Sequence, residues 1–166
     1  MAAVRRISLV TALTAVVLAL GASSALASVT IHENAGVGKA RLGRTDKHDK
    51  AYLGKVTAYY VDAAYSSPTY CYAFGKRLSY HRYALQMFSN SHHVVFEFAC
   101  NTARYVTTKG VKVGSTKARL KSTYGSKLKR HAAGQYWRYT LGHKPYTDFY
   151  VKKATGRVFE IIVRSR

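Results

Sequence analysis

The stretch from Lys109 to Gly125, KGVKVGSTKARLKSTYG, decides the expected fold. Thr116 is a favoured residue type for the start of a helix, and Gly125 is a favoured one for its end. Between them, Leu120 and Tyr124 are four residues apart, so they share one face of a helix. The stretch therefore predicts a short helix over 116–125 with a partly apolar face.

A weaker copy of this pattern, RLGRTDKHDKAYLG, runs from Arg41 to Gly54. Both stretches contain Gly-x-Thr, and in both a second Gly follows the Thr after eight residues. The copy predicts a helix over 45–54. When Gly43 is aligned with Gly114, Asp49 takes the place of Leu120. Asp49 is therefore the position at which this prediction of the fold is first tested.

Segments rich in aromatic and β-branched residues follow each expected helix, as strands do. They are YYVDAAYSSP, TYCYAF, LSYHRYALQMF and HHVVFEFACN after the first, and YWRYTL, YTDFYVKK and RVFEIIVRS after the second. Strands that come in runs, rather than alternating with helices, indicate an antiparallel sheet. We predict an α+β fold: two helix-then-antiparallel-strands repeats that share or abut one sheet, with the helices packed on one face.

The first residues have the pattern of a secretory signal peptide. Arg5 and Arg6 precede an apolar run, and Ala25-Leu26-Ala27 forms a small-x-small cleavage signal. The run is short for a membrane span. We predict a signal peptide at 1–27, a first degenerate repeat at 28–109 and a second repeat at 110–166, with export to the cell exterior or the envelope.

The chain is strongly basic, with 27 Lys and Arg against 7 Asp and Glu. Such a surface attracts polyanions, including acidic wall polymers. The basic residues are spread along the chain, which disfavours specific nucleic-acid binding. Partners are therefore expected among extracellular or envelope proteins and acidic wall polymers.

Two cysteines, Cys71 and Cys100, occur in the expected mature chain. An even pair in an exported protein suggests a disulfide. The strands at 69–74 and 93–101 could be neighbours, and we predict a Cys71–Cys100 bridge between them.

The residues that could serve acid–base chemistry have no shared spacing. They are His81, His92, His93, Glu97, His131 and His143. A small secreted basic nuclease could use such groups with Lys or Arg on the phosphate. No metal-ligand spacing, phosphate loop or nucleophile turn accompanies them, so no catalytic, metal or cofactor site is predicted.

Aromatic residues are more informative, because the chain has 14 Tyr. A sheet covered by helices on one face leaves half of its strand positions on the other. Tyr, Trp and Arg on that open face suit a contact surface, although Tyr also favours strands for its own sake. The predicted surface comprises Tyr70, Tyr72, Tyr80, Arg82, Tyr136 and Arg138.

The region from Tyr105 to Val163 resembles a known family. Its pattern of Gly110-Val111-x-x-Gly114-x-Thr116, a short helix, Gly125 and strands that end in GRVFEI is similar to the BamE (SmpA/OmlA) and β-lactamase-inhibitor-protein-like fold. It also looks like a group of small secreted actinobacterial proteins. The resemblance implies protein binding through an exposed sheet face and no catalysis.

The function expected from these observations is a secreted, non-enzymatic binding module. It would recognise a protein or an envelope macromolecule through an aromatic and basic sheet face. A cell-wall polyanion binder that acts through charge alone and a small secreted nuclease are the alternatives.

Overall fold

The computed structural model describes residues 27–62 and 67–165. The expected signal peptide at 1–27 therefore lies almost wholly outside the described residues. No helix in the described part of the chain is both long and apolar enough to cross a bilayer.

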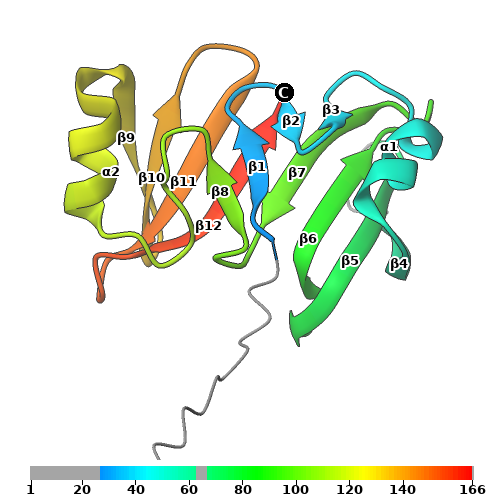
Figure 1. The fold of residues 1–166 in the computed structure, drawn as a ribbon, viewed down its shortest axis with the longest axis horizontal. Helices are drawn as coiled ribbons and strands as arrows, with labels where there is room; N and C mark the ends of the chain where they lie inside the picture. Colours follow the sequence, from blue (N-terminus) through cyan, green and yellow to red (C-terminus); the bar gives the residue numbers. More distant parts are fainter. Residues whose placement is uncertain (1–26, 63–66, 166) are drawn as a thin grey trace, which may run out of the picture.

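Strands dominate the architecture, which is built from two sheets and two short helices (Figure 1). The eight-stranded sheet has the order β4 (Val56–Asp62), β5 (Thr69–Ser79), β6 (Arg82–Ser89), β7 (Val95–Cys100), β12 (Val158–Arg164), β11 (Tyr146–Lys152), β10 (Tyr136–Leu141) and β9 (Leu128–Ala133). The four-stranded sheet has the order β3 (Ala40–Arg41), β2 (Gly36–Val37), β1 (Val29–His32) and β8 (Tyr105–Thr107). All neighbours pair antiparallel except β1 and β8, which are parallel.

The helices α1 (Asp46–Leu53) and α2 (Lys117–Tyr124) lie toward opposite ends of the large sheet, with the small sheet between them (Figure 1). Thr45 and Thr116 occupy the two N-cap positions, and Gly54 and Gly125 occupy the two C-cap positions. The predicted bounds of both helices are confirmed. A single turn of 3₁₀ helix, η1 (Gly125–Lys127), connects α2 to β9.

The predicted α+β architecture is wrong, because the chain is mostly β, with only two helices of eight residues each. The middle of the covered face of the large sheet is packed by the small sheet rather than by helices. That sheet forms because the segment 29–41 folds back on itself and pairs with β8. Neither this pairing nor β9, with its sequence LKRHAA, was predicted.

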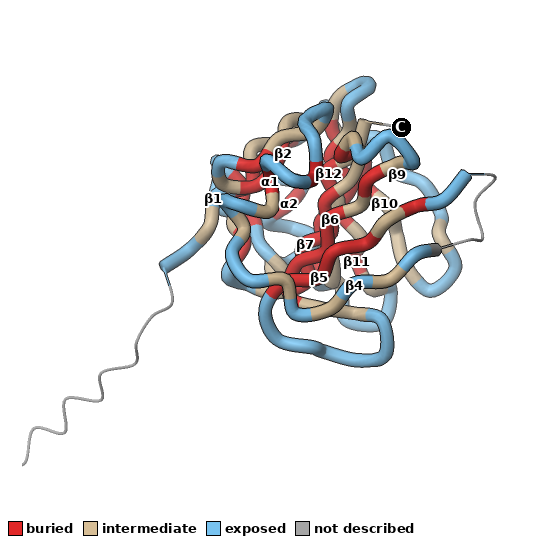
Figure 2. Tube along the Cα trace, turned by 90° about the vertical axis from the view of Figure 1, so that its right-hand side faces the viewer, coloured by how far each residue is buried: buried red, intermediate tan, exposed pale blue. Residues whose placement is uncertain are grey.

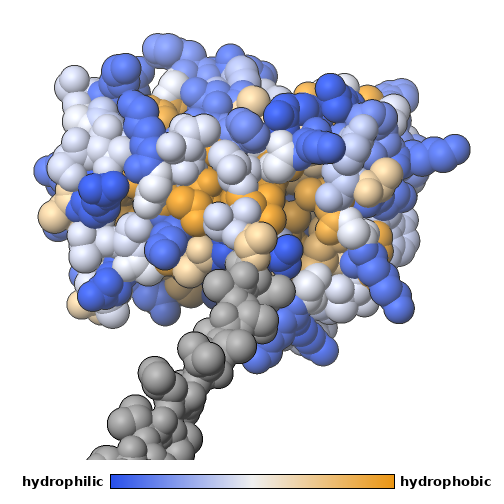
Figure 3. Space-filling view, viewed as in Figure 1, coloured by the Kyte–Doolittle hydropathy of each residue, from blue (hydrophilic) through white to orange (hydrophobic). Residues whose placement is uncertain are grey.

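The core lies between the two sheets and α2. Ile31 and Val37 of the small sheet and Leu120 of α2 join Phe98 and Phe149 of the large sheet in one apolar cluster. Figure 2 shows that buried positions follow the strands, whereas the connections are exposed. On the side that carries the helices, apolar side chains are visible at the centre and hydrophilic ones surround them (Figure 3).

The predicted disulfide is also wrong, since Cys71 and Cys100 are free and buried. β6 lies between the strands that carry the two cysteines, β5 and β7, so these two strands are about 10 Å apart. Cys71 is opposite Phe88 and Cys100 is opposite Leu85. Phe88 and Leu85 are three residues apart on β6, so the two thiols point to opposite faces of the sheet. A disulfide requires a Cα separation below about 7 Å.

Candidate functional site

The large sheet has one covered face and one face that no described helix or strand packs across. We call the second one the open face. It is identified by the alternation along each strand, because Phe98, Phe149 and Ile161 are core residues and their neighbours in the strands point the other way. The open face therefore carries Tyr60, Gln86, Glu97, Arg138, Asp148, Tyr150, Glu160 and Arg164.

Three of the six residues predicted for a binding surface, Arg82, Tyr136 and Arg138, lie half-exposed on the open face. Tyr80 lies at the turn between β5 and β6, where it is 78% exposed. The structure thus brings Arg82, Tyr136 and Arg138 onto one side of the sheet.

Tyr70 and Tyr72 are the exceptions, because they face the covered side. Tyr72 is buried, and Tyr70 packs against the core. Strand alternation correctly placed both on one face with Phe74, but it does not say which face meets the core. That face is the inner one here, because Phe74 belongs to the core cluster.

The centre of the open face is a row of mostly small or polar side chains, with Ile162 as the exception. Cross-strand pairing aligns Thr140, Asp148, Ile162, Ala99, Gln86 and Ala73 in register across six strands. Thr140 donates a hydrogen bond to Asp148, and Arg164 forms an ion pair with that carboxylate at 2.7 Å. The row is therefore fixed by polar contacts as well as by the sheet.

Large side chains flank this row. Arg82, Tyr136 and Phe159 form a group of side chains in mutual contact. The Arg82 guanidinium lies 3.7 Å from the Phe159 ring centroid, and Arg82 Nη2 donates to the Phe159 carbonyl at 2.9 Å. Tyr136 stacks on the same ring at 5.3 Å. Lys152 Nζ lies 4.5 Å from the ring centroid. Phe159 is placed here by the bulge in the pairing of β11 with β12, and sequence reasoning did not single it out.

Charged groups on this face are partly desolvated. Burial raises the pKa of Glu160, and the nearby Arg82 charge offsets that rise only in part. Burial likewise lowers the pKa of Arg82. Burial raises the pKa of Tyr150, while a hydrogen bond with Arg138 acts in the opposite direction. These groups are held in a medium less polar than water, where contacts with a partner are stronger.

A second polar network lies beside the aromatic group. Gln86 Nε2 donates to Tyr60 Oη at 2.7 Å and to the His81 carbonyl at 3.1 Å. Arg82 Nε donates to Asn101 Oδ1 at 3.0 Å. Gln86 and Asn101 are buried, so the side chains of the open face are held in place before any partner arrives.

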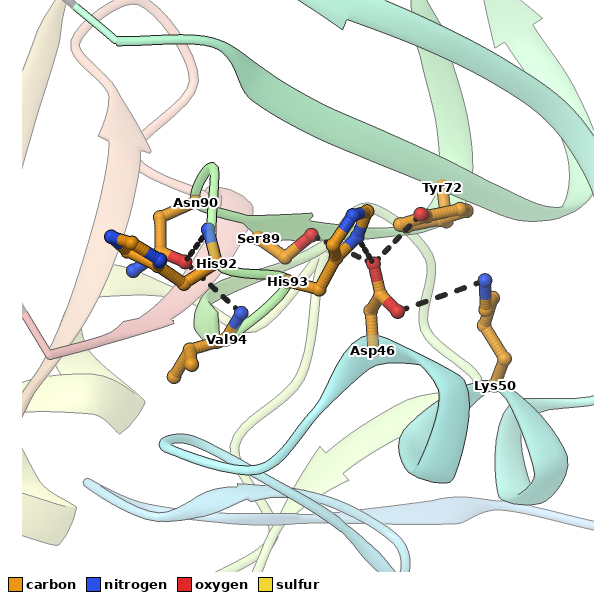
Figure 4. Close-up of polar contacts among 8 residues, drawn as sticks. All are labelled: Asp46, Lys50, Tyr72, Ser89, Asn90, His92, His93 and Val94. Atoms are coloured by element: carbon orange, nitrogen blue, oxygen red, sulfur yellow. Dashed lines mark hydrogen bonds and ion pairs between the residues drawn. The ribbon is translucent and has the colours of Figure 1, made fainter.

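Asp46 organises the other notable cluster, at the start of α1 (Figure 4). Its Oδ2 accepts hydrogen bonds from Tyr72 Oη at 2.7 Å and Ser89 Oγ at 3.1 Å, and lies 2.9 Å from His93 Nδ1. Lys50 Nζ lies 3.8 Å from Oδ1. Burial would raise the pKa of Asp46, but the hydrogen bonds from Tyr72 and His93 and the Lys50 charge outweigh it and lower the pKa.

The Asp46–His93 contact resembles the pair that orients a general base. No described hydroxyl or thiol is hydrogen-bonded to the other ring nitrogen, so no protein nucleophile is paired with this imidazole. Ser89 donates to Asp46 itself. The cluster instead fastens the β6–β7 turn to α1, as does the bond from the Asp46 amide to the His93 carbonyl at 2.8 Å.

The residues considered for catalysis do not form a common site. His81 is at the β5–β6 turn, His92 and His93 are at the β6–β7 turn, Glu97 and His131 are on β7 and β9, and His143 is at the β10–β11 turn. Within the described residues, no group of three or more His, Cys, Asp or Glu side chains is arranged to hold a metal ion.

Comparison with known proteins identifies a fold and no family. No family model matches the chain, and no curated protein matches it. Among solved structures, the uncharacterized protein YfeY from Escherichia coli is similar, with a TM-score of 0.58 and 13% identity over 82% of this chain and 99% of that one. An extracellular protein containing an SCP domain from Bacillus anthracis is also similar, with a TM-score of 0.52 and 10% identity over 75% of this chain and 44% of that one.

Proposed function

We propose that this protein is an exported, non-enzymatic module that binds a protein partner through the open face of its large sheet. The observation that carries the proposal is the group of Arg82, Tyr136 and Phe159 on a face that no described helix or strand packs across. Arg and Tyr are enriched among the residues that contribute most to protein interfaces.

The ordered state of this face favours tight binding. Fixing a long side chain at an interface costs roughly 0.5–1.5 kcal/mol. Arg82 is already held by Asn101 and by the Phe159 carbonyl, so most of this cost has been met within the folded chain.

Charge indicates the chemistry of the partner. The sequence carries a net charge of +20. The open face has three carboxylates, Glu97, Asp148 and Glu160, of which the last two are next to Arg164 and Arg82. Arg138 and Lys152 add positive charge. We therefore infer an acidic protein surface as the partner, with electrostatic attraction speeding its approach.

One further observation supports the proposal. The Bacillus anthracis neighbour is described as extracellular, which agrees with the export that we propose. Fold likeness alone does not set function, so the open face remains the main support.

The test is a capture of secreted and envelope proteins on the immobilised mature chain, followed by titration of the purified captured protein. We expect the double variant Tyr136→Ala, Arg138→Ala to weaken binding at least about tenfold, which corresponds to about 1.4 kcal/mol. The matched control is Tyr52→Ala, Arg119→Ala, which removes one exposed Tyr and one exposed Arg from the two helices. Equal binding by the two variants would contradict the proposal.

Salt separates this function from wall-polymer binding. At about 0.5 M salt the screening length is about 4 Å, so attraction between exposed charges is largely lost. Binding through a shaped face persists at that concentration. Retention on walls that disappears there would support the charge-only alternative.

A further inference from the structure

A pocket of about 550 Å³ lies on the covered side of the molecule, away from the open face. Core residues Tyr124 and Leu141 form part of its wall. The rest comes from the β1–β2 turn, the segment after β8, η1, the start of β9 and the β10–β11 turn. Its volume lies within the range of about 300–1,000 Å³ that is usual for small organic ligands.

Glu33 fixes one wall of this pocket. Its Oε2 accepts a hydrogen bond from Thr108 Oγ1 at 2.6 Å, and its Oε1 accepts one from Tyr124 Oη at 2.6 Å. One carboxylate thus joins the β1–β2 turn, the end of β8 and α2. Burial would raise the pKa of Glu33, but these two hydrogen bonds outweigh it and lower the pKa, so the group is charged at neutral pH.

The opposite rim is fixed by a close approach between two turns. Gly142 has a φ of +83°, and a Cβ at this position would overlap the Asn34 side-chain amide. Asn34 is held by the hydroxyl of Thr147. This Oγ1 accepts a hydrogen bond from the backbone amide of Asn34 at 2.8 Å and donates one to Asn34 Oδ1 at 2.9 Å. The pocket is therefore shaped before any ligand binds.

Positive charge exceeds negative charge in the lining. Lys109 and Lys127 contribute two basic side chains, and Glu33 is the only carboxylate among the lining residues. Lys129 also borders the pocket, but its pairing with Thr140 directs its side chain to the open face. No ion pair is formed by Lys109 or Lys127 within the described chain. Lys109 Nζ lies 5.4 Å from the Tyr124 ring centroid, and His143 adds an imidazole at the rim.

We propose that this pocket binds an organic phosphate, with its phosphoryl group between Lys109 and Lys127 and its hydroxyl groups at Glu33. A phosphate monoester carries a charge of about −1.5 to −2 at pH 7, which two ammonium groups can balance. The ionised Glu33 carboxylate lines the pocket and can accept a hydrogen bond from a ligand hydroxyl. A ligand of this kind uses both the basic and the acidic wall.

The phosphate could be a free polyol or sugar phosphate, or a repeating unit of a phosphate-bearing polymer, since the recognised chemistry is the same. Neither case depends on the proposed open-face function, because the pocket and the open face are on different sides of the sheet. Variants in one leave the other unchanged, so the two ideas fail separately.

The test is calorimetric titration of the mature chain with glycerol 3-phosphate, inorganic phosphate and glycerol. We expect glycerol 3-phosphate to bind with a Kd below about 1 mM, which is about −4 kcal/mol, and glycerol not to bind. Lys109→Ala, Lys127→Ala should weaken binding at least about tenfold. The control Lys47→Ala, Lys55→Ala removes the same charge at exposed positions outside the pocket and should bind as the unchanged protein does.

Equal weakening by the two double variants would overturn the proposal, because attraction would then follow total charge. Lack of binding by glycerol 3-phosphate up to about 10 mM would overturn it as well. Glu33→Gln tests the acidic wall, and we expect it to reduce the preference for glycerol 3-phosphate over inorganic phosphate. Competition by short poly(glycerol phosphate) at lower concentration than the monomer would assign the polymer as the source, and weaker competition would assign the free phosphate.

Discussion

The two helices have the same length and the same start and stop residues, yet they are attached to the rest of the molecule by different forces. α2 buries Leu120 and Tyr124. At the position that corresponds to Leu120, α1 buries Asp49, with Asp46 one turn before it. Leu53, which corresponds to Tyr124, is only partly buried against the core. The first helix is therefore held largely by hydrogen bonds, and the second by apolar contact.

This difference shows that local sequence signals locate a helix but do not determine how it packs. Asp49 Oδ2 accepts a hydrogen bond from the backbone amide of Arg41 at 2.9 Å, at the end of the small sheet. The apolar-to-acidic change at Asp49 is thus a docking contact for a neighbouring strand. We therefore expect α2 to be sensitive to the loss of apolar side chains, and α1 to be sensitive to the loss of its carboxylates and to acid.

Loss of the apolar anchor of α2 should have the largest effect. Leu120 is fully buried in the core, and replacing such a Leu with Ala removes contacts and leaves a cavity. We expect Leu120→Ala to lower the free energy of unfolding by about 2–5 kcal/mol, measured by urea denaturation. Ala118→Gly on the exposed side of α2 is the control for helix propensity, with an expected loss of about 1 kcal/mol. Similar losses in the two variants would show that α2 is not held by its apolar face.

An apolar side chain in place of Asp49 of α1 should destabilise the fold. Asp49→Leu leaves the partly buried Arg41 amide without its partner, and an unpaired buried group costs about 1–3 kcal/mol. Asp49→Asn keeps an acceptor at that position and should cost less. The measurement is again urea denaturation. If Asp49→Leu were as stable as the unchanged protein, α1 would be attached in the same way as α2, and the contrast between the helices would be lost.

Sequence reasoning found both helices because the Thr and Gly residues that begin and end them are local signals. It missed β9, whose sequence LKRHAA has little apolar alternation because it is an edge strand with exposed Lys129, Arg130 and His131. It also missed the small sheet, whose parallel pairing of β1 with β8 joins segments that are far apart in the chain. Those two omissions account for the incorrect fold class.

The sites show the same limit. Of the residues predicted for the binding surface, Arg82, Tyr136 and Arg138 lie on the open face, whereas Tyr70 and Tyr72 lie on the covered face. Alternation shows which residues share a face but does not say which face meets the core. The pocket at Glu33 could not be predicted. Its hydrogen bonds to Thr108 and Tyr124 span 75 and 91 residues, and no local pattern marks such contacts.

The charged attachment of α1 should respond to acid. The pKa of Asp46 is lowered in the folded state below its ordinary value of 3.8. Its ionised form therefore stabilises the fold above about pH 4, and this contribution is lost as the pH falls through the lowered pKa. We expect Asp46→Asn to be less stable than the unchanged protein by about 1–2 kcal/mol at pH 5, because it keeps an acceptor but loses the charge.

The decisive measurement is the difference in unfolding free energy between Asp46→Asn and the unchanged protein at pH 5 and at pH 2. The difference should shrink toward pH 2, as the native carboxyl takes up its proton through the lowered pKa. Other acidic groups titrate in both proteins and cancel in the comparison. A difference that stays constant with pH would mean that the charge of Asp46 does not hold α1.

The smallest expected effect is the difference in stability loss between substitutions at the two N-cap residues, Thr116 and Thr45. Thr116 Oγ1 accepts a hydrogen bond from the Arg119 amide at 3.1 Å, whereas Thr45 makes no side-chain cap bond. Replacing a capping Thr with Ala typically costs about 1 kcal/mol, so Thr116→Ala should lose about that much and Thr45→Ala less than about 0.5 kcal/mol. Both are exposed, and the substitution is the same, so the pair isolates the cap. Equal losses, measured by thermal and urea unfolding, would mean that Thr45 also caps its helix. The start of α1 would then depend on its own sequence as the start of α2 does, rather than on the contacts that Asp46 makes with the β6–β7 turn.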